Sequence, residues 1–256
     1  MSNFSPYANY GYLSLIKETT AGTAVTPTNF LRLINAGIET NFGTVDVQEI
    51  AGTRERQIRS VASKIEVGGD VEFYVESKMI GHFFRGLYGA PTTQTITANK
   101  SYRHVFTVTD TPQTYTIDIK PAGAPWTHRY YGVMITALKF EQDDNRIKCT
   151  ATLAPRKAFI NARVTTAVGS GTALAVDQNA GLTTSDSILV LDKADGVTVK
   201  ATLTLSAIGA DGLSLTTSTI GTSLAVDDII VIKKAASVTY DQDKIFTWMG
   251  GSQVYT

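Results

Sequence analysis

The sequence predicts a nearly all-β protein with one helix and a separate small β-domain. Apolar and polar residues alternate with period two along most of the chain, which is typical of half-buried strands. Only one segment follows the helical period instead. A third observation is compositional: residues 160–239 contain no Phe, Trp, Tyr, Pro or His, and all 23 aromatic residues lie outside that segment.

The clearest alternation runs from Val61 to Glu76. One parity is apolar and includes Val67, Val71 and Phe73, whereas the other is mostly charged. This pattern predicts a long strand with one buried and one polar face. Gly68 and Gly69 interrupt its middle, where we expect a bend or a bulge.

Further strands are predicted on the same grounds. They are residues 10–17, 30–38, 45–50, 102–109, 114–119, 131–142 and 146–153. The turn signal Asp110-Thr111-Pro112 separates the fourth from the fifth. Asp143-Asp144-Asn145 separates the last two and predicts a hairpin.

The helix is predicted at residues 77–89. Met79, Ile80, Phe83, Phe84, Leu87 and Tyr88 fall on one helical stripe. Ser77 is the expected N-cap, and Gly89 with Pro91 ends the segment. We expect an amphipathic helix lying over a sheet.

The aromatic-poor segment predicts an all-β accessory domain at residues 164–235 with five or six short strands. It contains a weak internal repeat, in which Leu182, Asp186, Ile188 and Val190 match Leu224, Asp228, Ile230 and Ile232 in spacing. Aromatic residues return after Tyr240. The simplest interpretation is an insertion, with the main domain formed by residues 1–163 and 236–256. Two domains in series, with a C-terminal tail, is the alternative.

Composition argues against an enzyme. We find no phosphate-binding glycine loop, dinucleotide fingerprint or Gly-x-Ser-x-Gly elbow. His82, His104 and His128 lie at no ligand spacing from one another or from Cys149, the only cysteine. Cys149 alternates with apolar residues and is expected in the core. We therefore predict no catalytic residue, no metal site and no cofactor.

Charge and hydropathy bear on partners and location. The 23 basic and 23 acidic residues cancel, so a general nucleic-acid binder is not indicated. The N-terminal segment lacks the features of a signal peptide, and no stretch is long and apolar enough to span a membrane. We expect the protein to reside in the cytoplasm of the producing cell until it assembles.

Several segments outside residues 164–235 resemble the major tail tube protein of long-tailed, siphovirus-like bacteriophages. The run YLSLIKETTAGTAVTPTNFLRL is similar to the family's opening strand, loop and second strand. EIAGTRERQIRSVASKIEVGGDVEFYVESKMIGHFFRGLYGAP resembles its long loop, long strand and short helix. YYGVMITALKFEQDDNRIKCTATLAP resembles a later hairpin, and FTWMGGSQVY the last segment. Residues 164–235 are not expected in the minimal family fold. The resemblance leaves open a further C-terminal part.

The resemblance implies a tail-tube β-sandwich or barrel with one flanking helix. It implies a structural virion protein that forms hexameric rings. These rings would stack into a hollow tail tube that conducts DNA to the host cell. Its partners would be further copies of the chain and the tape measure, terminator and distal tail proteins, with DNA passing transiently and without specific binding. The alternatives are a related ring or tube subunit of a baseplate or secretion system, and a surface- or carbohydrate-binding module formed by residues 164–235.

Two groups of residues are candidates for assembly and conduction. The long polar loop predicted at residues 41–60 is a candidate subunit interface, with charged residues Glu49, Arg54, Glu55, Arg56 and Arg59. The polar parity of the long strand is a candidate lumen lining, with Glu66, Asp70, Glu72 and Glu76, because carboxylates repel phosphate. A mobile surface loop and an ordinary solvated strand face are the respective alternatives.

Overall fold

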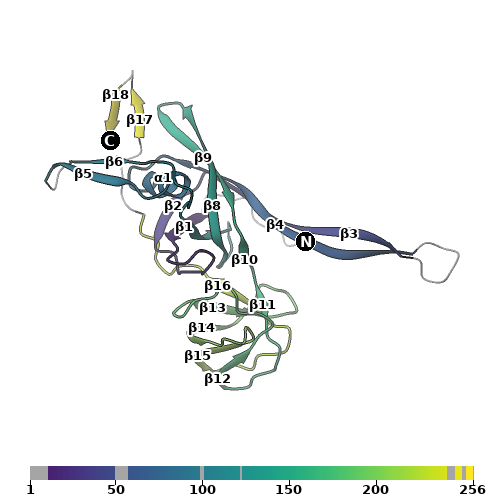
Figure 1. Cartoon of the computed structure of the whole chain (residues 1–256). Helices are drawn as coiled ribbons and strands as arrows, with labels where there is room; N and C mark the ends of the chain where they lie inside the picture. Colours follow the sequence, from purple (N-terminus) through teal and green to yellow (C-terminus); the bar gives the residue numbers. More distant parts are fainter. Residues whose placement is uncertain are drawn as a thin grey trace.

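A computed structural model describes residues 11–49, 57–98, 101–121, 123–240, 246–249 and 252–255. Within these ranges the chain forms eighteen strands and one helix (Figure 1). The prediction of a mainly β fold with a single helix is therefore confirmed.

The elements before residue 160 are β1 (Tyr12–Lys17), β2 (Asn29–Arg32), β3 (Asn35–Glu49), β4 (Gln57–Tyr74), α1 (Ile80–Tyr88), β5 (Thr92–Thr97), β6 (Ser101–Val105), β7 (Tyr115–Lys120), β8 (Trp126–Asp143), β9 (Arg146–Ala154) and β10 (Lys157–Phe159). The remaining elements are β11 (Ala162–Arg163), β12 (Gly171–Ala175), β13 (Ser187–Leu191), β14 (Val199–Ile208), β15 (Ser214–Ile220), β16 (Ile229–Lys233), β17 (Phe246–Met249) and β18 (Ser252–Tyr255).

Strand β8 is shared by two antiparallel layers. Its first half pairs with β7, which continues to β1 and β2. Its second half pairs with β9, which continues to β4 and β3. The β8–β9 pairing slips between Ile135 and Ala137, and such a bulge bends a strand. One long strand thereby serves both layers of the main body.

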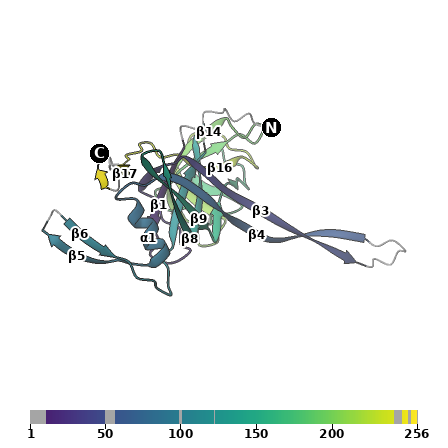
Figure 2. The same ribbon diagram turned by 90° about the horizontal axis from the view of Figure 1, so that it is seen from above.

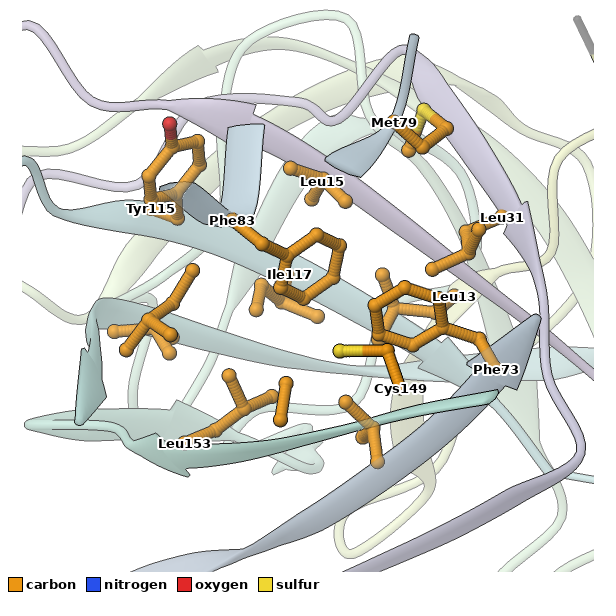
Figure 3. Packing of buried hydrophobic residues seen from close by; sticks show 14 of the residues in the cluster. Leu13, Leu15, Leu31, Phe73, Met79, Phe83, Tyr115, Ile117, Cys149 and Leu153 are labelled. Carbon is orange, nitrogen blue, oxygen red and sulfur yellow. The ribbon is translucent and has the colours of Figure 1, made fainter. Parts of the chain in front are cut away.

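The core of the main body lies where these layers meet (Figure 3). Its fully buried members include Leu13 and Leu15 of β1, Phe73 of β4 and Ile117 of β7. Cys149 of β9 is 0% exposed and packs among them, as its alternation predicted. Burial of these side chains is the main stabilising contribution to this part of the fold.

Helix α1 covers this core with its apolar stripe. Phe83 packs on Phe73 with ring centroids 4.5 Å apart, and the Tyr115 hydroxyl donates a hydrogen bond to the His82 carbonyl at 2.9 Å. The helix begins later than predicted: Met79 occupies the N-cap position without a side-chain hydrogen bond, so Ser77 is not the cap. Gly89 is at the C-cap, where its amide donates to the Arg85 carbonyl.

The segment predicted as a loop at residues 41–60 is mostly strand. β3 and β4 pair continuously from Asn35 opposite Glu72 to Glu49 opposite Gln57, and residues 50–56 lie outside the described part. The loop prediction was wrong because these polar segments pair with each other and so satisfy their backbone hydrogen bonds. The strand also predicted at residues 45–50 falls within β3 as far as Glu49. Figures 1 and 2 show this hairpin, the β3–β4 arm, projecting far from the body.

Gly68 and Gly69 mark the point where the β3–β4 arm leaves the body. Before Gly69, β4 pairs only with β3, whereas from Gly69 to Tyr74 it also pairs with β9. The register slip expected here lies instead farther along the arm, between the pair Phe42–Ile65 and the pair Thr44–Ala62. The glycines thus sit where one strand passes from a two-stranded ribbon into a sheet.

A second core lies within residues 159–232, around Leu174, Ile188, Leu203 and Ile230. Strands β12 to β16 surround it, in agreement with the five or six short strands expected. The two bodies are joined by strand pairing, since Ile232 and Lys233 of β16 lie opposite Thr127 and Trp126 of β8. The domain boundaries themselves stay a prediction.

After β16 the chain returns to the main body. The Ala235 amide donates to the Tyr12 hydroxyl at 2.8 Å, and Tyr240 forms a parallel bridge with Phe30. β17 then pairs with β9 at Thr247 and with β18.

Candidate functional site

The outer face of β4, β9 and β8 is the surface on which the candidate lumen residues lie. Because side chains alternate along each strand, the residues between the core positions point outward. The register aligns Glu72, Thr150 and Lys139 in one row across β4, β9 and β8. It aligns Tyr74, Lys148 and Glu141 in the next row on the same face. We call this surface the β4–β9–β8 face.

Charges on the β4–β9–β8 face form a connected series. Lys148 Nζ lies 3.9 Å from a Glu72 carboxylate oxygen and 3.4 Å from one of Glu141. Lys139 Nζ contacts Glu141 at 2.5 Å, and this hydrogen bond lowers the pKa of the Glu141 carboxyl. Exposed ion pairs of this kind contribute little to stability. Their consequence is electrostatic, because Glu72 and Glu141 each have a lysine ammonium group nearby.

Aromatic contacts continue this series at one end. The Tyr74 hydroxyl donates to Asp143 at 2.8 Å, which raises the pKa of the phenol. The Arg146 guanidinium lies 5.0 Å from the centre of the Tyr74 ring. These contacts connect side chains of β4, β8 and β9 on the β4–β9–β8 face.

The candidate lumen residues do not share one environment. Asp70 is exposed and Glu72 partly exposed on the β4–β9–β8 face. Glu66 lies in the β3–β4 arm, where only the backbone is described. Glu76 differs from the expectation: it follows the end of β4 and is 3% exposed, so its side chain does not lie on the open surface of the subunit. The prediction fails for Glu76 because β4 ends at Tyr74, two residues before it.

The sequence reasoning also missed residues that share this face. The described face carries four carboxylates against three cations, namely Asp70, Glu72, Glu141 and Asp143 with Lys139, Arg146 and Lys148. The alternation in residues 139–148 could have identified them, because the predicted hairpin turn at 143–145 places both strands in register. The face is therefore nearly neutral, not strongly acidic.

The candidate interface residues lie at the far end of the β3–β4 arm. Glu49 is the last residue of β3, and Arg59 lies in β4 opposite Val47. Arg54, Glu55 and Arg56 fall outside the described residues. Residues 40–49 and 57–68 thus form a two-stranded ribbon whose strands pair only with each other among the described elements. Both its edges offer unpaired backbone groups.

A second hairpin, β5–β6, also stands apart from the large sheet. Its residues are almost all exposed, and Ile96 is 66% exposed. β5 was not predicted, because a Thr-rich polar segment lacks apolar alternation. Figure 2 shows β5–β6 and the β3–β4 arm extending to opposite sides of the body.

The titratable residues considered for chemistry lie in different places. Burial lowers the pKa of His82, which is on α1, and that of His128, which is on β8. Burial raises the pKa of the Cys149 thiol to about 12. Within the described residues, no cluster of three or more His, Cys, Asp or Glu side chains could hold a metal ion. No helix in the same ranges could cross a membrane.

A comparison with solved structures includes the following weak likeness. The cryo-EM structure of the anti-feeding prophage (AFP) baseplate, 6-fold symmetrised, contains a chain with 10% identity and a TM-score of 0.39. The alignment covers 62% of this chain and 96% of that one. A likeness at this score supports no argument. No curated protein matches the sequence.

A family model gives the informative match. The model described as phage tail tube protein matches residues 9–229. This range extends through residues 164–229, which we expected to lie outside the minimal family fold, and it stops before the predicted last segment at 246–255. The match covers most of the sequence, including β1 to β15, and so the chain belongs to the phage tail tube protein family.

Proposed function

We propose that this chain is a structural virion subunit that self-assembles into hexameric rings, and that these rings stack into a hollow tail tube through which DNA passes to the host cell. The observation that carries the proposal is family membership over residues 9–229. The shape of the subunit supports it, because two hairpins project from the body with little support of their own.

The β3–β4 arm is the proposed contact with a neighbouring subunit. A two-stranded ribbon is marginally stable in water unless something packs on it. The backbone hydrogen bonds of residues 40–49 and 57–68 are formed only between these two strands among the described elements. We therefore expect another chain to supply the further stabilisation. A closed ring supplies such a partner to every copy and limits uncontrolled edge pairing. Glu49, Arg54, Glu55, Arg56 and Arg59 are the proposed polar contacts.

The β4–β9–β8 face is the proposed lumen lining. A conduit must let DNA slide, so it should present no net cationic surface, which would bind phosphates by releasing the counterions condensed on the DNA. Paired charges such as Glu72 with Lys148 meet that requirement without a uniformly acidic wall. Asp70 and Glu72 keep their proposed lining role, and Glu141 and Asp143 join them.

The remaining parts of the proposal concern location and partners. The chain would accumulate in the host cytoplasm and end in the virion tail. There it would contact tape measure, terminator and distal tail proteins at the ends of the tube. These contacts follow from the family alone.

The test is negative-stain electron microscopy of the purified chain over a concentration series. We expect six-fold rings or hollow tubes. The triple variant R54E/R56E/R59E should prevent ring formation, whereas R163E/D227K, which exchanges an exposed pair in residues 162–233, should assemble normally. A monodisperse monomer at every concentration would overturn the proposal. Normal tubes from the triple variant would remove only the arm contact.

A further inference from the structure

Residues 162–233 consist of two copies of one structural unit. The spacing match between Leu182 and Leu224 is repeated in three dimensions, because the strands that follow, β13 and β16, pair with each other. Ile188 lies opposite Ile232, and Val190 opposite Ile230. In a shift of 42 residues, Ile188 corresponds to Ile230 and Val190 to Ile232. The pairing is thus reciprocal about Leu189 and Val231, as a two-fold axis requires.

The two units are also interlocked through reciprocal backbone hydrogen bonds. The Val164 amide donates to the Asp228 carbonyl at 3.0 Å, and the Leu205 amide donates to the Asp186 carbonyl at 2.9 Å. The return bonds match as well: Asp227 donates to the Val164 carbonyl and Ser185 to that of Leu205, both at 2.9 Å. Each unit therefore completes the other.

An aspartate turn precedes the final strand of each unit. The Asp186 carboxylate accepts the Thr183 amide at 2.8 Å, and the Asp228 carboxylate accepts the Ala225 amide at the same distance. The residue before each aspartate, Ser185 or Asp227, has a positive φ near 75° (77° and 72°). The two turns share geometry and burial, since Asp186 is 3% exposed and Asp228 0%.

The two turns differ in the cation that they bind. Asp228 binds Lys200, which belongs to residues 162–233, at 2.9 and 3.1 Å. Asp186 instead binds Arg129 of β8, in the main body, at 2.6 and 3.2 Å. Only the first turn is therefore used across the junction between the two bodies.

Arg129 is held from both sides of that junction. Its other donors reach Asp118 of β7 at 2.8 and 3.0 Å, and it also donates to the Gly181 carbonyl at 3.2 Å. The side chain is 1% exposed. On the main-body side Thr26 adds a contact, since its hydroxyl donates to Asp186 at 3.0 Å. Bidentate arginine–carboxylate pairs fix orientation as well as distance.

A second difference between the units lies beside the same turn. Gly181 has a φ of +94°, and a Cβ there would lie 2.8 Å from the Tyr131 ring and 2.9 Å from Phe159 Cβ. The corresponding position in the second unit is Ser223. The first unit thus has no side chain where its turn lies against Tyr131 of the main body.

We propose that the first aspartate turn of this duplicated domain is its anchor, and that Arg129 is the positioning residue which fixes the domain on the tube body as one rigid unit. The inference rests on the proposed domain division at residues 164–235. The β16–β8 junction alone, with two residue pairs, leaves a rotation open. The contacts of Arg129 with the separate loop at residues 181–186 close it.

The test measures a distance between the two bodies within one chain. Cysteines are introduced at Ala137 of β8 and Thr202 of β14, both exposed, and carry spin labels. The buried Cys149 should remain unlabelled. Labelled chains are diluted in unlabelled chain, so the distance is intramolecular whether or not tubes form. Failure of the proposed assembly would not affect this readout.

We expect a single narrow distance distribution in the parent protein. The variants D186N and G181A should broaden it at least two-fold, whereas the matched variants of the second turn, D228N and S223A, should leave it narrow. R129K, which keeps the charge but loses the fork, should give an intermediate width. A parent distribution that is already broad, or equal widths for D186N and D228N, would overturn the anchor.

Discussion

At the residue scale, burial decides the reactivity of Cys149. The thiol is fully buried beside Phe73, and its pKa is raised to about 12, so almost no thiolate exists at neutral pH. We predict that the native chain does not react with a thiol reagent at pH 8 but reacts with one equivalent in denaturant. Rapid modification of the native protein would contradict the packing of β9.

Asp195 illustrates how a turn sets acid sensitivity. Its carboxylate accepts the hydroxyl and amide of Thr198 and the amide of Val197, and these bonds lower its pKa to about 2. Since the folded pKa lies below that of the unfolded chain, the turn's contribution is complete above about pH 4. It is lost as the pH falls through about 2. We predict this titration by NMR of the side-chain carboxyl, and D195N should remove the corresponding part of the pH dependence. A midpoint near 4 would contradict it.

The backbone of β3 opposite Gly69 leaves no room for a side chain at this position. A Cβ on Gly69 would lie 2.0 Å from the Gly37 carbonyl oxygen, and φ is +152°. We predict that G69A lowers the free energy of unfolding by more than about 2 kcal/mol, since a backbone clash adds to strained φ. The control is G68A, where the nearest atom lies 3.5 Å away, with an expected change of less than about 1 kcal/mol. Equal midpoints in urea would contradict this role.

At the element scale, strands with an apolar parity could be predicted from the sequence, and the polar segments at residues 57–60 and 92–97 could not. Residues 146–153 and 114–119 alternate because one face is buried in the core, so their pattern records tertiary structure. The sequence predicted a loop at residues 57–60, where β4 begins, and β5 is exposed throughout. Hydrogen bonding with a neighbour forms these strands, and that information is absent from single-strand patterns.

Helix α1 shows that residues on one amphipathic stripe are not equally buried. Phe83 is 1% exposed against the core, whereas Tyr88, on the same predicted stripe, is 37% exposed. We predict that F83A lowers the free energy of unfolding by about 3–5 kcal/mol, because it leaves a cavity beside Phe73. Y88A should cost less than about 1 kcal/mol. Chemical denaturation of both variants measures the difference, and similar losses would show that the helix does not dock as described.

At the scale of the whole molecule, the candidate site depends on residues brought together from separate strands. The acidic parity of β4 was visible in the sequence, but the cations that offset it come from β8 and β9. Their contacts with Glu72 depend on register, which a hairpin turn fixes for one pair of strands only. The electrostatic character of a sheet face is therefore a property of the assembled sheet.

The nearly neutral charge of the β4–β9–β8 face leads to a prediction for the proposed tube. The variant D70N/T150K/T152K adds three positive charges to the β4–β9–β8 face, and T202K/T204K/S206K adds three to exposed positions of β14. Tubes formed in the presence of a short DNA duplex should retain none in the parent protein. The first variant should retain DNA that nuclease cannot digest, with binding that weakens steeply as salt rises. The β14 variant should retain only digestible DNA, because the proposed lumen lining is the β4–β9–β8 face and does not include β14. Digestible DNA on the first variant, or protected DNA on the second, would place the β4–β9–β8 face outside the lumen.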